Sequence, residues 1–243
     1  MYNKGIILKP NKNLGQHFLC DEGVLASIAG LVPAGYKQYI EVGPGSGNLT
    51  KFLTCSPLTC LELDTRFEAI PGVKWINIDA LRYDYNREDY VLGNLPYNIS
   101  GPLFKKICID QIEGFTFLVQ KEVAERICAT SGKDYGRLSV LVQAFFDVQY
   151  HFDVSPEAFT PPPRVNSAVI TGVRNIKNNI AMDVLDEVCF EIFKHRRKQI
   201  SSGIRRDIAS RLLLAGVPQT ARPENIPPEV IWQLADTINT KVT

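Results

Sequence analysis

Short apolar runs rich in β-branched and aromatic residues recur along the first half of the chain, and several are separated by segments with helical spacing. The runs cover residues 38–42, 58–63, 73–78, 90–93 and 115–120, and each has the length and composition of a strand. The helical segments cover 23–31, 103–112 and 121–130. Strands that alternate with helices are typical of a parallel sheet covered on both faces, so the pattern predicts an α/β fold.

The pattern changes in the last third of the chain. Two further strand candidates, 146–152 and 166–173, lie close together and predict an antiparallel edge on the sheet. Three consecutive prolines at 161–163 lie between them and predict a rigid loop, since proline cannot donate to a sheet. After a polar linker at 176–179, residues 184–193, 200–214 and 226–238 have helical spacing. We therefore expect one domain over 1–176 and a small helical domain over 177–243.

Composition excludes several classes of protein. Hydrophobic residues make up 45% of the chain and charged residues 22%, which is the balance of a chain that folds around a core. No run approaches the roughly 18 apolar residues of a membrane span, and we expect no secretion signal at the N-terminus. The six cysteines form no C-x-x-C pair, which argues against a metal site or a disulfide framework and favours the cytoplasm.

The net charge of +1 is unevenly distributed. Residues 1–173 carry 16 Lys+Arg and 18 Asp+Glu, whereas residues 174–243 carry 11 and 8. Within 194–211, seven basic residues face one acid, Asp207. This cluster is either a solvated helix face or a surface that binds a polyanion.

A glycine-rich segment follows the first of the five runs. Gly43, Gly45 and Gly47 give the spacing G-x-G-x-G, and a helix is expected to begin near Asn48. The dinucleotide-binding spacing needs a glycine where Asn48 stands, and the phosphate-binding G-K-[ST] is missing. Glu41, just before the loop, disfavours a pyrophosphate and suits a ligand with an ammonium group. The segment up to residue 62 is short for a full helix and turn.

Two carboxylates follow the next two predicted strands. Glu62 stands where an acid can accept hydrogen bonds from both ribose hydroxyls, and Asp79 is placed to accept the exocyclic amine of an adenine ring. The loop and the two acids together predict binding of S-adenosylmethionine.

The fourth strand leads into Asn94-Leu95-Pro96-Tyr97, which resembles the N/D-x-P-Y/F signature of methyltransferases that act on exocyclic amines. The Asn94 side-chain carbonyl and the Leu95 backbone carbonyl can each accept one N6 hydrogen of adenine, which favours a nucleophilic nitrogen. Pro96 holds the turn, and Tyr97 offers a ring on which an extruded base stacks.

From about residue 12 to 206 the chain resembles the KsgA-type small-subunit rRNA adenine N6,N6-dimethyltransferases. Its motifs follow that family's order at 12–19, 41–50, 62–64, 79–80, 94–100, 120–124, 135–139, 159–165 and 193–198. The resemblance implies a Rossmann-like methyltransferase sheet in the first domain and RNA binding by the helical domain. It implies cofactor contacts at His17, Leu19, Gly43, Gly45, Glu62, Asp79 and Asn94. His17 departs from the asparagine common in that family.

The resemblance also implies the reaction. The family converts two adjacent adenosines in the 3′-terminal hairpin of small-subunit rRNA to N6,N6-dimethyladenosine during subunit biogenesis. Phe159 would stack on the target adenine opposite Tyr97, unless it is an ordinary core residue. The expected phosphate contacts are Arg196, Arg197, Lys198, Arg205 and Arg206. The implied partners are the rRNA and the assembling small subunit, and we expect a monomer.

Three alternatives stay open. Large-subunit rRNA adenine methyltransferases share the loop, the acids and the N-x-P-Y turn, but Leu95 replaces their usual isoleucine and the Phe-Thr-Pro-Pro-Pro run disfavours them. An RNA-binding assembly factor without activity is disfavoured by the intact Asn94 turn and Glu62. A DNA adenine methyltransferase is weaker still, because no base-reading module is evident.

Overall fold

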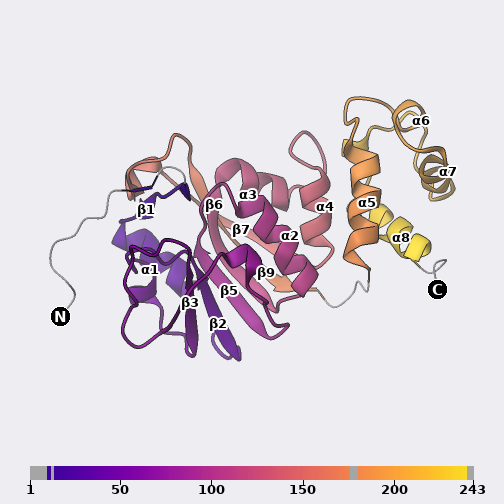
Figure 1. Cartoon of the computed structure of the whole chain (residues 1–243). Helices are drawn as coiled ribbons and strands as arrows, with labels where there is room; N and C mark the ends of the chain where they lie inside the picture. The colour runs from indigo at the N-terminus through magenta and orange to yellow at the C-terminus, as the bar shows by residue number, and fades with distance from the viewer. Residues whose placement is uncertain (1–9, 12–13, 176–179, 240–243) are drawn as a thin grey trace.

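The computed structural model describes residues 10–11, 14–175 and 180–239. Seven strands form one sheet in the order β4-β3-β2-β5-β6-β9-β7 (Figure 1). The bounds are β2 (Gln38–Val42), β3 (Leu58–Glu62), β4 (Lys74–Asn77), β5 (Asp89–Asn94), β6 (Gly114–Gln120), β7 (Phe146–Val154) and β9 (Ser167–Arg174). The first five strands of the order are parallel, β9 is antiparallel to β6, and β7 is antiparallel to β9. The predicted parallel sheet with an antiparallel edge is confirmed.

Both faces of the sheet are covered. Helix α1 (Glu22–Gly30) packs on one face, with the Asp21 side chain capping its first turn. Helices α2 (Ser100–Asp110), α3 (Lys121–Cys128) and α4 (Arg137–Gln143) pack on the other. Successive strand residues alternate between the two cores, as in Tyr39 and Ile40. Burial on both faces explains why the runs that form the central strands β2, β3, β5 and β6 are mostly apolar.

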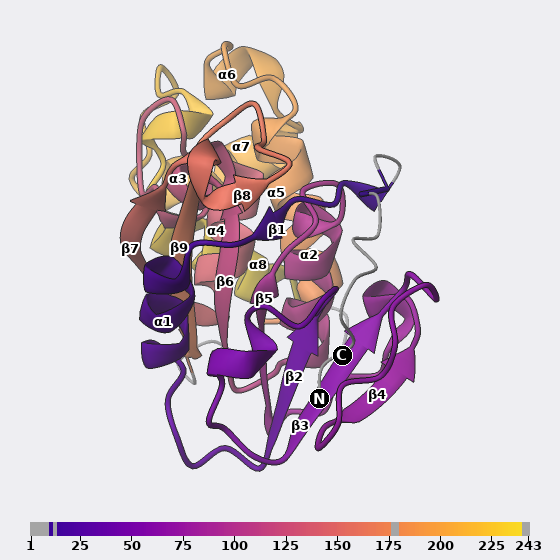
Figure 2. The same cartoon turned by 90° about the vertical axis from the view of Figure 1, so that its left-hand side faces the viewer.

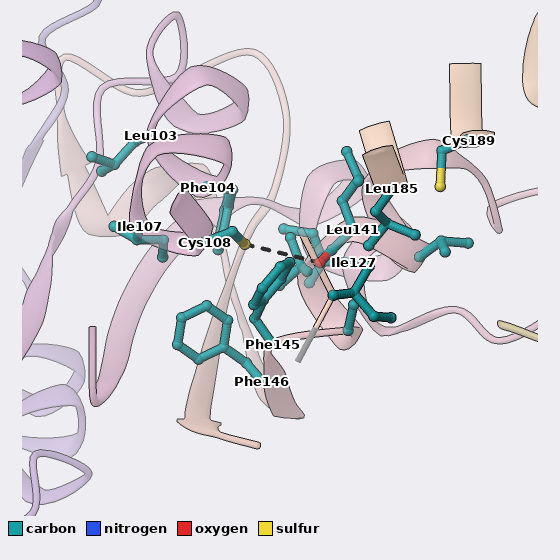
Figure 3. Packing of buried hydrophobic residues seen from close by; sticks show 14 of the residues in the cluster. Leu103, Phe104, Ile107, Cys108, Ile127, Leu141, Phe145, Phe146, Leu185 and Cys189 are labelled. Atoms are coloured by element: carbon teal, nitrogen blue, oxygen red, sulfur yellow. Dashed lines mark hydrogen bonds between the residues drawn. The ribbon is translucent and has the colours of Figure 1, made fainter. Parts of the chain in front are cut away.

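The larger core lies between the sheet and α2, α4 and α5 (Met182–Phe193). Figure 3 shows Phe104 and Cys108 of α2 facing Leu141 of α4, with Leu185 of α5 beyond it. Phe104 also meets Phe115 of β6 edge to face, with ring centroids 5.4 Å apart. Each such buried ring or aliphatic side chain contributes about 1.5–3 kcal/mol of transfer free energy.

Of the C-terminal helices, α5 and α8 pack against α4. Beyond α5 follow α6 (Ile200–Gly203), α7 (Arg206–Leu214) and α8 (Pro228–Asn239) (Figure 1). Buried side chains of α5 and α8 belong to the same core as those of the sheet. The helix-rich segment expected over 200–214 contains two helices, because the chain is extended at Ile204 after the poor helix former Gly203. The expected linker at 176–179, and with it the domain boundary, lies outside the described residues.

The helix expected near Asn48 is absent. A single 3₁₀ turn, Thr50–Phe52, stands in its place. The chain must pass Pro57 and enter β3 at Leu58, which leaves no room for a full helix. That prediction was wrong.

The structure contains a small second sheet that the sequence analysis did not predict. β1 (Phe18–Leu19) pairs antiparallel with β8 (Phe159–Thr160), and strands this short show no periodicity. Figure 2 shows β1 running across one end of the large sheet beside β8, which brings the N-terminal segment over the ends of the parallel strands. No helix within the described residues has both the length and the apolar character needed to cross a membrane.

Candidate active site

A cleft opens where the parallel strands end, beneath the N-terminal segment. In open α/β sheets this edge, beyond the carboxyl ends of the strands, is where ligands bind. Its walls come from five segments of the chain: residues 14–18, 42–45, 61–63, 78–80 and 94–99. Of the residues predicted from the sequence, nine line it: His17, Gly43, Gly45, Glu62, Asp79, Asn94, Leu95, Pro96 and Tyr97.

The glycine loop closes the cleft beyond β2. Gly43 and Gly45 have φ angles of +66° and +54°, which residues with a side chain rarely adopt. A Cβ on Gly45 would also stand 3.1 Å from the Phe18 ring of the N-terminal segment. The Gly45 N–H donates to Glu62 Oε2 at 2.9 Å, so the loop and the end of β3 are held together.

Glu62 is only 5% exposed and each of its oxygens accepts one backbone N–H, from Gly45 and from Asp64. Burial raises the pKa of the Glu62 carboxyl, and the backbone N–H groups of Asp64, Gly45 and Leu63 oppose that effect. A carboxylate has about four acceptor sites, so Glu62 can still accept from a bound hydroxyl. The residues present therefore fit the two ribose hydroxyls of an adenosine moiety.

Asp79 lies at the next strand end and begins the 3₁₀ turn Ala80–Arg82. Its Oδ1 accepts the Leu81 N–H at 2.9 Å, and Oδ2 has no hydrogen-bond partner among the described residues. Leu63 and Ile78 line the wall between the two acids. An apolar wall with one carboxylate oxygen at its end fits an adenine ring with its exocyclic amine.

Asn94, at the end of β5, is fixed by its amide nitrogen. Nδ2 donates to the His17 carbonyl at 2.9 Å, so Oδ1 is left as an acceptor at the cleft. The Leu95 N–H donates to Leu118 of β6, and the Ile99 N–H donates to the Pro96 carbonyl, which makes the turn rigid. The site therefore presents a preset side-chain acceptor beside a backbone turn.

The segment above the cleft is fastened by contacts that the sequence did not predict. Gln16 Nε2 donates to Asp64 Oδ2 at 2.8 Å, and Asn48 Nδ2 donates to the Leu19 carbonyl at 2.8 Å. Hydrogen bonds from Arg66 hold the pKa of Asp64 well below its usual range, with a smaller contribution from Gln16. Gln16 and Asp64 belong to two quoted motifs, but only the fold brings them together. Lys12 and Asn13 of the N-terminal motif lie outside the described residues.

Two predicted residues do not line the cleft. Leu19 is 2% exposed and offers only its backbone carbonyl, which Asn48 occupies. Phe159 is 3% exposed and belongs to the core that also contains Leu19 and Val169. The structure therefore has Phe159 as a core residue, and stacking on a base would require the ring to leave that core.

Glu41 does not face a ligand, contrary to the prediction. It is 1% exposed, accepts from the Thr50 hydroxyl at 2.7 Å and lies beside the Cys60 thiol. Burial raises its pKa to about 7. The Glu41 side chain therefore points into the packing beside the sheet instead of the cleft. Its contact with Thr50 connects β2 to the turn that follows the glycine loop.

The basic cluster divides into bound and exposed side chains. Arg196 donates to the backbone carbonyls of Lys133 and Tyr135, both at 2.7 Å, and so ties the C-terminal helices to the α3–α4 connection. Arg205 forms ion pairs with Glu187 and Asp207. The remaining three, which are exposed and have no ion pair with another described residue, are Arg197, Lys198 and Arg206.

A sheet of this order, with a glycine loop, a buried carboxylate and an N-x-P-Y turn at its strand ends, fits an S-adenosylmethionine-dependent amine methyltransferase. The sequence profile of the family described as ribosomal RNA adenine dimethylase matches residues 7–240. The chain belongs to this family, so its cofactor is S-adenosylmethionine and its reaction is adenine dimethylation in ribosomal RNA.

Individual proteins are similar to this chain in sequence or in fold. The protein named ribosomal RNA small subunit methyltransferase A of Coxiella burnetii is 39% identical, over 94% of this chain and 97% of its own. A dimethyladenosine transferase from Plasmodium falciparum has the same fold, with a TM-score of 0.75 and 23% identity over 93% of this chain and 98% of its own. The 23S rRNA methyltransferase ErmE also has it, with a TM-score of 0.70 and 23% identity over 91% and 99%.

Proposed function

We propose that the protein dimethylates N6 of two adjacent adenosines in the 3′-terminal hairpin of small-subunit rRNA during assembly of that subunit. The observation that carries the proposal is the preset Asn94 amide at the end of β5, in the same cleft as the buried Glu62 carboxylate. The choice of subunit is supported by the 39% identical relative named for the small subunit. We further propose that it works as a monomer in the cytoplasm on the assembling particle.

When bound, S-adenosylmethionine supplies an electrophilic methyl group. The N6 lone pair of adenine is conjugated into the ring and is a poor nucleophile. Asn94 Oδ1 and the Leu95 carbonyl each accept one N6 hydrogen, which favours a tetrahedral nitrogen with its lone pair free. Methylation makes the nitrogen acidic, so its proton leaves to water and no strong base is required. Tyr97 offers its ring for base stacking.

The second methyl transfer to the same nitrogen uses fewer contacts. A monomethylated N6 has one hydrogen, so only one of the two acceptors can be satisfied. The other acceptor must then face the first methyl group or solvent. We expect the second methyl transfer to depend less on Asn94 than the first, because the Leu95 carbonyl alone can hold the one remaining hydrogen.

The helical part supplies phosphate contacts. The exposed side chains of Arg197, Lys198 and Arg206 are available to an RNA backbone, whereas Arg196 and Arg205 are engaged within the protein. We therefore restrict the proposed RNA-binding surface to Arg197, Lys198 and Arg206. Each phosphate contact makes binding fall further with added salt.

Large-subunit rRNA is the second candidate substrate, since a large-subunit methyltransferase shares the fold. The test is incubation of the protein with methyl-labelled S-adenosylmethionine and with unmethylated small or large subunits, followed by mapping of the modified bases. We predict dimethyladenosine at two adjacent positions near the small-subunit 3′ end, formed far more slowly by the Asn94→Ala variant. Label in large-subunit RNA alone would replace the proposed substrate.

A further inference from the structure

The Tyr97 ring, half-buried at the cleft, is held by its hydroxyl. The Tyr97 hydroxyl and Ser167 Oγ share a hydrogen bond of 2.6 Å. Ser167 is fully buried at the start of β9, where its backbone pairs with Gln120 of β6 and Val154 of β7. Since strands on both sides fix Ser167, it is a stationary anchor for the far end of the ring.

The same ring is also held by one of its faces. The His17 imidazole stacks on Tyr97 with ring centroids 5.6 Å apart and an angle of 27° between the planes. His17 Nδ1 donates to the Pro161 carbonyl at 2.8 Å, because a carbonyl can only accept. Pro161 begins the proline loop that leads into β9. His17 therefore joins the N-terminal segment, the Asn94 turn and the proline loop.

We propose that Ser167 and His17 are positioning residues that fix the plane of the Tyr97 ring, so that the face turned away from His17 meets the target adenine. The inference rests on the proposed function. A ring already held at its hydroxyl and on one face loses little freedom when a base stacks on it, so the base is placed against Asn94 at lower cost. Asparagine at position 17 would leave that face of Tyr97 without a ring.

The chain contains a matched pair without this role. The Tyr90 hydroxyl and Thr116 Oγ1 share a hydrogen bond of 2.8 Å in the same sheet, with both residues buried away from the cleft. Thr116→Val removes that hydrogen bond as Ser167→Ala removes the other. A purely structural effect would appear in both variants, whereas a positioning effect appears only in Ser167→Ala.

The first test is a double-mutant cycle on methylation of unmethylated small subunits. Ser167→Ala and Tyr97→Phe should each lower kcat/KM about 3–10-fold, mainly by raising KM, and the double variant should equal Tyr97→Phe alone. Thr116→Val should lower stability and leave kcat/KM unchanged. Additive effects of Ser167→Ala and Tyr97→Phe, or a Ser167→Ala protein equal to wild type, would overturn the role of Ser167.

The second test reads stacking directly. A hairpin RNA carrying 2-aminopurine at the target position is bound to the protein in the presence of S-adenosylhomocysteine, and its fluorescence is recorded. Stacking on Tyr97 should quench the probe in wild type and in His17→Phe, which keeps a ring, and less in His17→Ala. Equal quenching in His17→Ala would overturn the role of His17. If the wild-type protein methylates no rRNA, the proposed function is wrong. If the wild type methylates rRNA but the Ser167 and His17 variants behave like it, only the positioning role is wrong.

Discussion

The Asn94 amide has two roles: its nitrogen donates to the His17 carbonyl, and its oxygen is an acceptor at the cleft. We predict that Asn94→Ala lowers kcat by roughly 10²–10³-fold, the usual cost of removing one preset group that stabilises a transition state. Binding of the RNA, measured by filter binding, should change little.

Asn94→Asp is the informative companion variant. It keeps an acceptor but places a carboxylate oxygen against the His17 carbonyl, so the repulsion should displace both groups and lower activity as well. Wild-type turnover by either Asn94 variant would remove the assigned role.

Glu41 makes stability depend on pH. Its carboxyl has a folded pKa of about 7 against an ordinary 4.5, so the folded state holds the extra proton between those values. Stability from this group is complete below pH 4.5 and is lost as pH rises to 7, by up to about 3 kcal/mol. Glu41→Gln has no proton to lose, so relative to wild type it should gain stability between pH 5 and pH 8. Urea unfolding at both pH values tests this, and parallel curves would contradict it.

At the scale of elements, β2 and β5 approach so closely beside the cleft that only glycine fits at position 93. A Cβ there would stand 2.5 Å from the Val42 carbonyl oxygen. Gly93→Ala should therefore destabilise the fold by about 1–3 kcal/mol or more and weaken cofactor binding, because Val42 leads into the glycine loop. Gly30→Ala in α1, where a Cβ meets nothing within 4 Å, is the control. Denaturant unfolding that is equal for the two variants would contradict the prediction.

Strands and long helices were predictable because burial on both faces leaves continuous apolar runs, as in β2 and β6. The failures are local. The two-residue strands β1 and β8 exist only because distant segments meet, and the break between α6 and α7 depends on one glycine within a helical pattern.

The site shows the same division. Glu62, Asp79 and Asn94 were predictable because acidic and amide residues directly after buried strands must gather at one edge of a parallel sheet. Glu41 and Arg196 were not, because a strand residue's face and an arginine's partners are decided by packing between elements. The anchoring of Tyr97 by Ser167 depends on a register that no local pattern contains.

At the scale of the whole molecule, the exposed cations of the C-terminal helices should govern RNA affinity. Replacing Arg197, Lys198 and Arg206 with alanine should weaken binding and flatten the plot of log affinity against log salt by about 2, at roughly 0.7 per contact with single-stranded RNA. Arg205→Ala should flatten it less than Arg206→Ala, because Glu187 and Asp207 already pair with Arg205. Filter binding across salt concentrations measures both, and an unchanged slope in the triple variant would remove this surface from the interface.

Arg196 has a different task at this scale. Its hydrogen bonds to Lys133 and Tyr135 join the C-terminal helices to the rest of the chain. Arg196→Ala should therefore lower the free energy of unfolding by about 1–3 kcal/mol, because charged hydrogen bonds are lost. The salt dependence of RNA binding should change little. Thermal unfolding of Arg196→Ala beside Arg197→Ala tests this, and equal stability of the two would contradict it.

The most direct test of the account is a crystal structure of the protein with S-adenosylhomocysteine and adenosine. We predict ribose hydroxyls on Glu62, the cofactor's adenine amine on Asp79, and the N6 of the free adenosine within hydrogen-bond distance of Asn94 Oδ1 and the Leu95 carbonyl. A cofactor bound away from the ends of β2–β5, or an adenosine whose N6 faces neither acceptor, would contradict it.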